Sequence, residues 1–353
     1  MSRTNGRRRP TPWLTVRGLL ATGLLALVTA GCVDLVLGPA PDADDAVANF
    51  DALWTEFDRH YSFFELKDVD WDALRAQYSP RVTPDLPDRE LLDVMGEILD
   101  HLEDGHVNLY TPLGPYSYDG WFEPYPVNFR WAMVESRVNS LRYSADGKVV
   151  RASLSEFGYI HVGDFVGDGR VSDLDEAVGE LMDKPGLIVD VRNNGGGSAR
   201  AARLFAGLFV DERFHHLDIR FRNGPEHDDF TEPEKRYIEP RSPRYTGPVV
   251  VLTNRRVFSA AEDLVLAVKR IPSVTVIGDT TGGGAGNPIF RELPNGWTFR
   301  LSRWIATDPS GWTWEGVGIA PDIRVVQTDA DADAGREPVL DTAVAVLRAR
   351  VGG

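Results

Sequence analysis

The sequence predicts an α/β fold with a largely parallel sheet and flanking helices, preceded by a small N-terminal helical domain. Buried runs rich in β-branched residues, "GLIVDV" (186–191) and "GPVVVLT" (247–253), alternate with helical patterns from residue 171 onward. Before them, apolar residues recur at helical spacing from Ala46 to about residue 102. The 353 residues are 42% hydrophobic and 26% charged, which is ordinary for a folded chain with a sizeable core.

The first 31 residues predict an export signal. A cationic stretch is followed by the apolar run "GLLATGLLALVTA" (18–30), which is too short to span a bilayer comfortably. The only cysteine, Cys32, comes directly after "VTAG" and resembles the lipidated residue of a bacterial lipoprotein box. The alternative is an ordinary signal peptide that happens to precede a cysteine. Residues 32–45 are expected to form a flexible tether.

These features predict an exported protein, lipid-anchored to the bacterial cell envelope and facing the periplasm or the outside. Because Asp34 does not directly follow Cys32, the usual acidic signal for inner-membrane retention is not indicated, which favours an outer-membrane anchor. Loss of residues 1–31 removes five arginines and no acids, so the net charge changes from −15 to −20. Nucleic-acid partners are not expected of a chain this acidic. A single cysteine excludes a disulfide framework and a cysteine-based metal site, and we expect no metal or other cofactor.

In chain order, the helical domain is expected over residues 46–112 and the α/β domain over 113–353. The helical patterns of the first domain cover residues 46–64, 70–80 and 87–102. Short β-like runs follow at 125–135, 140–145, 149–154 and 157–165. Helix and buried strand then alternate over 171–184, 186–197, 198–210, 247–254, 259–271 and 273–279. A solvated stretch at 329–338 precedes a closing helix at 339–350.

Ser259 stands where a buried strand gives way to a helix. In an open α/β sheet, sites form at the carboxyl ends of strands, and helix N-termini there offer free N–H groups. The small Ala260 and Ala261 would let a substrate carbonyl approach the Ala260 amide. A serine is also a favoured helix N-cap, and capping alone would explain it in most proteins.

Three consecutive glycines follow the buried strand that begins at residue 186 and come directly before the helical pattern at 198–210. Gly195, Gly196 and Gly197 permit unusual dihedral angles and leave backbone amides unobstructed. One such amide, paired with that of Ala260, would form an oxyanion hole for acyl transfer. A phosphate-binding loop is disfavoured because no lysine follows the glycines and the "GxGxxG" spacing is missing. A tight turn with no chemical role is the simpler alternative.

A nucleophilic serine needs a base. Lys269 lies about 15 Å along the same helix and is too far away. Of the seven histidines, His215, His216 and His227 fall in a polar region that is expected to be exposed. His106, at a strand entry after Gly105, and His161, in "GYIHVGDF", remain nearly equal candidates on spacing alone.

These motifs together resemble the serine peptidase family that includes the tail-specific (C-terminal processing) proteases, the tricorn core protease and interphotoreceptor retinoid-binding protein. The matching segments are "DVRNNGGG", "VFSAAEDL", "VIGDTTGGG" and "EGVGIAPDI", and the N-terminal helices also look like those of the branch without processing specificity. The resemblance covers about residues 46–345. It implies a crotonase/ClpP-like core and hydrolysis of peptide bonds in peptides or unfolded proteins.

The resemblance assigns roles residue by residue. Ser259 matches the nucleophile, and Ala260, Gly196 and Gly197 match the oxyanion-hole amides. The processing branch uses a lysine base, but Gly284 stands at that position, which excludes a Ser–Lys dyad. His106 and Glu315 match the histidine and glutamate of the tricorn-like branch, in which Glu315 would orient the imidazole.

Two departures from the family pattern matter. The tricorn-like tetrad has a serine beside the histidine, whereas this chain has Gly105. Only about 80 residues separate His106 from Asp190, so no intact PDZ domain fits between them, and tail specificity is not expected. Two other classes stay open: a noncatalytic binding lipoprotein that retains the peptidase fold, and an acyl-CoA enzyme, which the scarcity of lysine and arginine disfavours.

Overall fold

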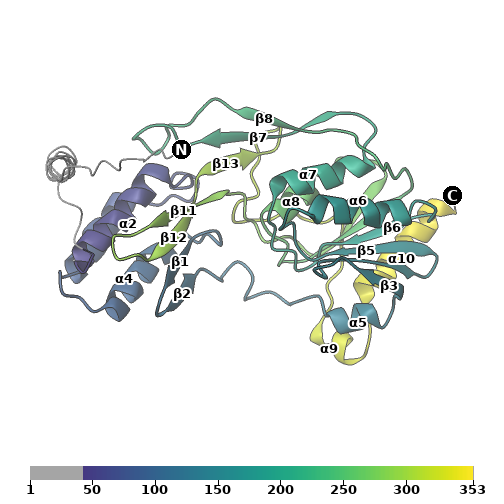
Figure 1. Cartoon of the computed structure of the whole chain (residues 1–353), viewed down its shortest axis with the longest axis horizontal. Coiled ribbons are helices and arrows are strands. Elements are labelled where there is room, and N and C mark those ends of the chain that lie inside the picture. The colour runs from purple at the N-terminus through teal and green to yellow at the C-terminus, as the bar shows by residue number, and fades with distance from the viewer. Residues whose placement is uncertain (1–42, 353) are drawn as a thin grey trace, which may run out of the picture.

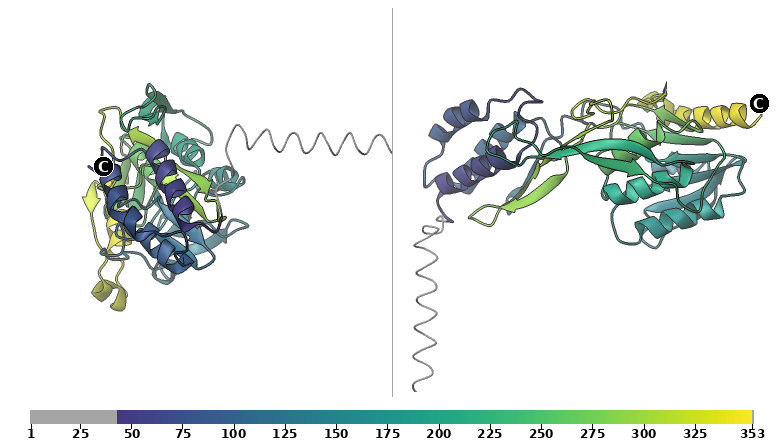
Figure 2. Two further views of the ribbon diagram at one scale, coloured as in Figure 1. Left: turned by 90° about the vertical axis from the view of Figure 1, so that its left-hand side faces the viewer. Right: turned by 90° about the horizontal axis from the view of Figure 1, so that it is seen from above.

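The computed structural model describes residues 43–352. The predicted export signal, Cys32 and most of the tether lie outside the described residues. A smaller lobe with helices at one end of the molecule is joined to a larger α/β lobe at the other (Figure 1). Figure 2 shows that the molecule is elongated along the line joining the two lobes. Among residues 43–352, no helix has the length and apolar character needed to span a bilayer.

The larger lobe is built on a seven-stranded sheet. From edge to edge its strands are β14 (Ile323–Arg324), β10 (Val274–Gly278), β9 (Val249–Thr253), β6 (Leu187–Asp190), β5 (Phe157–Val162), β4 (Val149–Leu154) and β3 (Asn139–Tyr143). Neighbours from β14 to β5 run parallel, whereas β5, β4 and β3 pair antiparallel. The predicted α/β fold with a largely parallel sheet is confirmed.

Helices cover both faces of this sheet. Successive residues of a strand point to opposite sides, so Val249 and Val251 of β9 join one apolar core while Val250 and Leu252 join another. The first core is shared with α6 (Arg170–Glu180), α7 (Ala199–Ala206) and α8 (Ala260–Val268), and the second with α10 (Pro338–Val351). Burial on both sides explains why the central strands read as unbroken apolar runs.

Residues 125–135 do not form the predicted β-like run. Trp131–Glu135 is the short helix α5, and residues 126–130 have no regular structure. Val134 is fully buried, and Trp131, three residues earlier, packs against the same core. One helical turn brings both side chains to the core, which the alternating pattern of the sequence did not distinguish from a strand.

The smaller lobe contains the three predicted helices, α2 (Ala46–His60), α3 (Trp71–Tyr78) and α4 (Asp88–Asp100). They pack beside a four-stranded sheet in the order β11 (Pro288–Glu292), β12 (Thr298–Ser302), β1 (Asn108–Thr111) and β2 (Gly114–Ser117). Phe299 of β12 stacks on Phe57 of α2, with ring centroids 5.7 Å apart. A hairpin from late in the chain thus completes the core under the first helices, next to the strand that follows His106.

A three-stranded ribbon runs between the lobes (Figure 1). Its order is β13 (Trp304–Thr307), β7 (Phe214–Phe221) and β8 (Glu234–Ile238). Arg222, just beyond β7, donates to the backbone carbonyls of Asp58 and Tyr61 at the end of α2. The remaining short elements are η1 (Ser79–Arg81), η2 (Gly207–Phe209) and α9 (Asp329–Asp333).

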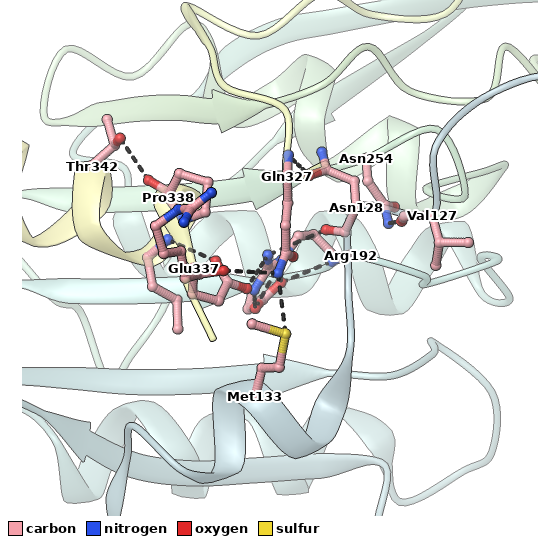
Figure 3. A network of polar contacts seen from close by, with 12 residues as sticks. Val127, Asn128, Met133, Arg192, Asn254, Gln327, Glu337, Pro338 and Thr342 are labelled. Atoms are coloured by element: carbon pink, nitrogen blue, oxygen red, sulfur yellow. Dashed lines mark hydrogen bonds and ion pairs between the residues drawn. The ribbon is translucent and has the colours of Figure 1, made fainter. Parts of the chain in front are cut away.

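A buried charged network ties the sheet to α10 (Figure 3). Arg192, two residues beyond β6, is fully buried and donates to both oxygens of Asp190, at 2.9 Å from Nε and 2.6 Å from Nη2. Its Nη1 donates to Glu337 at 2.7 Å, and the other oxygen of Glu337 accepts the Leu340 N–H at the start of α10. The Asp190–Arg192 pair of the "DVRNNGGG" segment therefore joins the end of β6 to the start of α10.

We expect Arg192→Met to lower the free energy of unfolding by roughly 3–5 kcal/mol, because Asp190 and Glu337 would be left buried without a counter-charge. Urea denaturation followed by circular dichroism measures the loss. Arg348→Met is the matched control, since Arg348 pairs with Glu156 at the surface and its loss should leave the unfolding curve nearly unchanged. Equal losses in the two variants would contradict a structural role for the network.

Candidate active site

Ser259 lies between β9 and the first residue of α8. Its backbone has φ = +55° and ψ = −126°, which residues with a side chain rarely adopt. Such strain persists only where the surrounding structure enforces it, and it concentrates at functional sites. Ala260 and Ala261 behind it are buried, so the start of the helix is packed into the core while Ser259 remains partly accessible.

The Glu262 carboxylate holds this turn in place. It accepts the Ser259 N–H at 3.0 Å, and it also accepts the Thr281 hydroxyl and the N–H groups of Gly283 and Gly284 at 2.6–2.7 Å. Burial raises the pKa of Glu262 to about 7, against the lowering effect of these hydrogen bonds. Sequence reasoning overlooked Glu262, although a glutamate three residues after a serine is the signature of a capping box.

The glycine loop lies directly against the Ser259 turn. A Cβ on Gly196 would sit 2.8 Å from the Ser259 Cβ and 2.9 Å from the Ala260 nitrogen, so only glycine fits there. Asn194 fixes the loop: its backbone carbonyl accepts the Phe258 N–H at 3.0 Å, and its side-chain oxygen accepts the Gly196 N–H at 2.9 Å. Within residues 43–352, the amides of Gly197 and Ala260 have no hydrogen-bond acceptor. Both residues line the same small cavity as Ser259.

His106 packs on the residue before Ser259. The rings of His106 and Phe258 are 4.7 Å apart, and His106 is 3% exposed. Within the described chain neither ring nitrogen has a hydrogen-bond partner, so Phe258 connects His106 to the Ser259 turn and no hydrogen bond joins the two side chains. Burial lowers the pKa of His106 to about 4, although the Asp104 carboxylate acts in the opposite direction.

The other histidines lie elsewhere. His161 packs between Phe129 and Trp131, at 5.4 and 5.2 Å, on β5. His216 is fully buried, contrary to the exposure predicted from its polar neighbourhood, and its Nε2 lies 2.6 Å from Asp263. His216 is buried because its strand, β7, contacts α8 through Asp263, and the local sequence does not reveal this contact.

Glu315 makes no hydrogen bond to His106. Its carboxylate pairs with Lys67 at 3.1 Å and accepts the Ala285 N–H at 2.7 Å. Burial and the nearby Asp104 raise the pKa of Glu315, against the lowering effect of Lys67. Asp104 is closer to the imidazole, since its Oδ1 accepts the His106 backbone N–H at 2.7 Å and lies 3.9 Å from Nδ1. Sequence reasoning overlooked both Asp104 and Lys67.

Phe258 occupies the space that side chains at two glycine positions would need. A Cβ on Gly284 would lie 2.2 Å from the Phe258 ring, and one on Gly105 would lie 2.9 Å from it. Gly105 also faces Trp121, whose ring stacks on Phe258 at 4.2 Å. This arrangement gives a packing reason for the two departures from the family pattern, the missing lysine and the missing serine. Within residues 43–352 no group of three or more His, Cys, Asp or Glu side chains could hold a metal ion.

Comparison with known proteins identifies the family. Residues 156–325 match the model for peptidase family S41, and residues 43–100 match that for the tricorn protease C1 domain. A crystal structure of a "putative peptidase" from Parabacteroides merdae is 36% identical, with a TM-score of 0.78 over 86% of this chain and 96% of that one. The chain belongs to peptidase family S41, which confirms the resemblance seen in the motifs.

More distant relatives share parts of the chain. The carboxy-terminal processing protease CtpA of Bacillus subtilis is 28% identical over 179 residues, which are 50% of this chain and 36% of CtpA. Tricorn protease homolog 1 of Streptomyces coelicolor is 29% identical over 224 residues, or 59% of this chain and 19% of the homolog. This chain therefore spans well under half the length of either. Mature CPAF has the same fold, with a TM-score of 0.64 at 12% identity over 87% of this chain and 97% of CPAF.

The pKa of His106 generates a stability prediction. The folded protein keeps this imidazole neutral down to about pH 4, whereas the unfolded chain takes up the proton near 6.5. Lowering the pH from 7 to 5 should therefore destabilise the wild type by about 2 kcal/mol relative to His106→Gln. Urea denaturation of both proteins at the two pH values measures the difference. Glu262 and Glu315 are present in both proteins, so their titration cancels in this comparison. An unchanged difference would show that the imidazole is not held neutral.

Proposed function

We propose that the protein is a serine-type endopeptidase that hydrolyses peptide bonds through an acyl-enzyme. The observation that carries the proposal is the strained Ser259 at a helix N-terminus beneath a glycine loop, with the Gly197 and Ala260 amides free beside it. Two amides so placed suit the oxyanion of a tetrahedral intermediate. The Gly196 amide already bonds Asn194, so Gly197 is the better of the two glycine donors.

His106 is the proposed general base. It would take the proton of the Ser259 hydroxyl during attack on the carbonyl and deliver it to the leaving amine. The low pKa leaves the imidazole neutral, and so able to accept a proton, at neutral pH. Because no hydrogen bond joins the two side chains in this state, the imidazole or the turn must shift when substrate binds. Catalytic hydrogen bonds often tighten only in the substrate complex.

A nearby carboxylate would support the imidazolium that this transfer creates. The Oδ1 atom of Asp104 lies 3.9 Å from Nδ1. Glu315 is paired with Lys67 at 3.1 Å and makes no hydrogen bond to His106. We therefore propose that Asp104 orients His106 and that Glu315, predicted for this role, sets the position of the Gly284–Ala285 backbone instead.

The substrates are proposed to be peptides or unfolded proteins without tail specificity. Residues 107–189 form β1 to β5, α5 and α6, and these elements belong to the two lobes. No part of that stretch forms the separate peptide-capturing domain that tail recognition would use.

Reaction with a fluorophosphonate probe tests the nucleophile. The wild type should label at Ser259, and Ser259→Ala should lose both labelling and casein hydrolysis. His106→Gln should lower the rate of both by at least about 100-fold, since a missing general base costs that much or more. His161→Gln is the matched control, a histidine buried against aromatic rings elsewhere, and should keep most of the activity.

The outcomes separate the candidate classes. A folded wild type that neither labels nor hydrolyses casein between pH 6 and 9 would favour a noncatalytic binding protein with the peptidase fold. Loss of activity in His161→Gln with retention in His106→Gln would reverse the assignment of the base. Retention on immobilised coenzyme A would favour the acyl-CoA alternative.

We also propose that Cys32 is lipidated and anchors the protein to the cell envelope, facing the periplasm or the outside. The support is the sequence alone: a cationic start, a short apolar run and small residues before the cysteine. In a bacterial host, the wild type should incorporate labelled palmitate and sediment with membranes. Cys32→Ser should lose the label and become soluble after export, and Ser62→Ala, a substitution within the described chain, should behave like the wild type. Equal labelling of all three proteins would exclude the anchor.

A further inference from the structure

A small cavity opens beside Ser259. It has a volume of about 70 Å³ and is lined by Ser259, Ala260 and Gly197. Leu217 and Ile219 of β7 also line it. Since the proposed nucleophile and both proposed oxyanion donors border this space, a side chain next to the scissile carbonyl would enter it.

The cavity has a polar end that the proposed mechanism does not use. Asp263, one turn along α8 from Ser259, lines the cavity together with Arg203 of α7. One carboxylate oxygen of Asp263 meets His216 Nε2 at 2.6 Å, and the other accepts from Arg203 Nη1 at 3.4 Å. These three residues come from three different elements, so packing and not a loop conformation fixes their positions.

Arg203 retains unused donors at this polar end. Its only acceptor within residues 43–352 is Asp263, which leaves the other guanidinium N–H groups available, and the side chain is 23% exposed. Asp263 is 8% exposed and keeps lone pairs that could accept from a hydroxyl. The charges of Arg203 and Asp263 offset each other. A neutral group that both donates and accepts hydrogen bonds therefore matches this end better than a carboxylate or an ammonium.

The volume of the cavity limits the size of the substrate side chain that can enter it. A single water needs about 10–15 Å³ measured in this way, and an apolar cavity of about 150 Å³ holds benzene. About 70 Å³ therefore accommodates a side chain of roughly three or four heavy atoms, the size of threonine or valine.

We propose that this cavity binds the side chain on the acyl side of the scissile bond and selects a small, neutral, hydroxyl- or amide-bearing residue through Arg203 and Asp263. The inference rests on the proposed peptidase function and names its substrate class. Threonine and valine have nearly the same shape, so their comparison isolates the hydrogen bonds. An apolar cavity of this size would favour valine, whereas a site with unpaired polar groups rejects it.

Internally quenched peptides that differ only in Thr or Val at this position test the proposal. The wild type should show a kcat/KM at least about ten-fold higher for the Thr peptide, as expected when buried charged groups would otherwise lose a partner. A peptide with Asp should be poorer than the Thr peptide because an ionised carboxylate has no proton to donate to Asp263. Arg203→Met should remove the Thr preference mainly by slowing hydrolysis of the Thr peptide, and Arg203→Lys should restore part of it. Arg200→Met, an exposed change on the same helix, is the matched control and should keep the preference.

The result that overturns the proposal is a kcat/KM for the Val peptide equal to or above that for the Thr peptide in the wild type. A Thr preference that survives in Arg203→Met would overturn the role of Arg203. Fluorophosphonate labelling of Ser259 in each protein separates these failures from failure of the peptidase function. If Ser259 is labelled but the Thr peptide is not preferred, only the subsite proposal is wrong. If the folded wild type is not labelled, the proposed peptidase function is wrong as well. Unfolding curves identify any variant that loses activity because it is destabilised. If Arg203→Met is such a variant, the comparison of Arg203→Lys with the wild type tests the role of Arg203.

Discussion

The arrangement of the site depends on one buried carboxylate. Glu262 accepts four hydrogen bonds, one from the Ser259 N–H and three from residues 281–284, which join the serine turn and the loop beyond β10 into one unit. The next amide of that loop, on Ala285, is held by Glu315, which pairs with Lys67 from the smaller lobe. A chain of buried carboxylates thus links α8 to the first helices of the protein. Burying a carboxylate is costly unless donors surround it, and each of these two has them.

Phe258, in the same serine turn, explains why Gly105 and Gly284 depart from the pattern of the related branches. Phe258 fills the space above Gly105 and Gly284, so a serine at the first or a lysine at the second would collide with its ring. His106 is consequently held by ring packing on Phe258 and by Asp104 through its backbone N–H, without a serine partner beside it. An aromatic ring and one backbone hydrogen bond thus hold His106 in place of a neighbouring hydroxyl. Trp121 also stacks on the Phe258 ring, and Arg255 Nε donates to the Trp121 carbonyl at 2.6 Å, which fixes this segment against the turn.

Local patterns were sufficient for much of the fold. The apolar runs of β6 and β9, the helical spacing of α2 and α4 and the glycine-ended strand before α7 are features of neighbouring residues. The meeting of the glycine loop with Ser259 was also predictable, because parallel strands gather their carboxyl ends at one edge. Contacts between distant segments were not. His216 and Asp263 are 47 residues apart, and Lys67 meets Glu315 across nearly the whole described chain. The burial of His216 and the return of the β11–β12 hairpin to the first lobe depend on such contacts, for which the sequence carries no periodic signal.

Two buried polar sites of the described chain, around Arg192 and at His106, differ in how well they are satisfied. Around Arg192 each carboxylate pairs with the guanidinium, and the Phe129 ring covers the guanidinium at 4.9 Å, so these charges are well satisfied. His106, by contrast, is buried with both ring nitrogens unpaired. An unsatisfied buried polar group costs about 1–3 kcal/mol, and His106 packs on the residue before a serine whose own backbone is strained. In the proposed mechanism, a shift that joined the imidazole to the Ser259 hydroxyl would recover part of that free energy. The resting arrangement would therefore lower the cost of assembling the proposed Ser259–His106 pair.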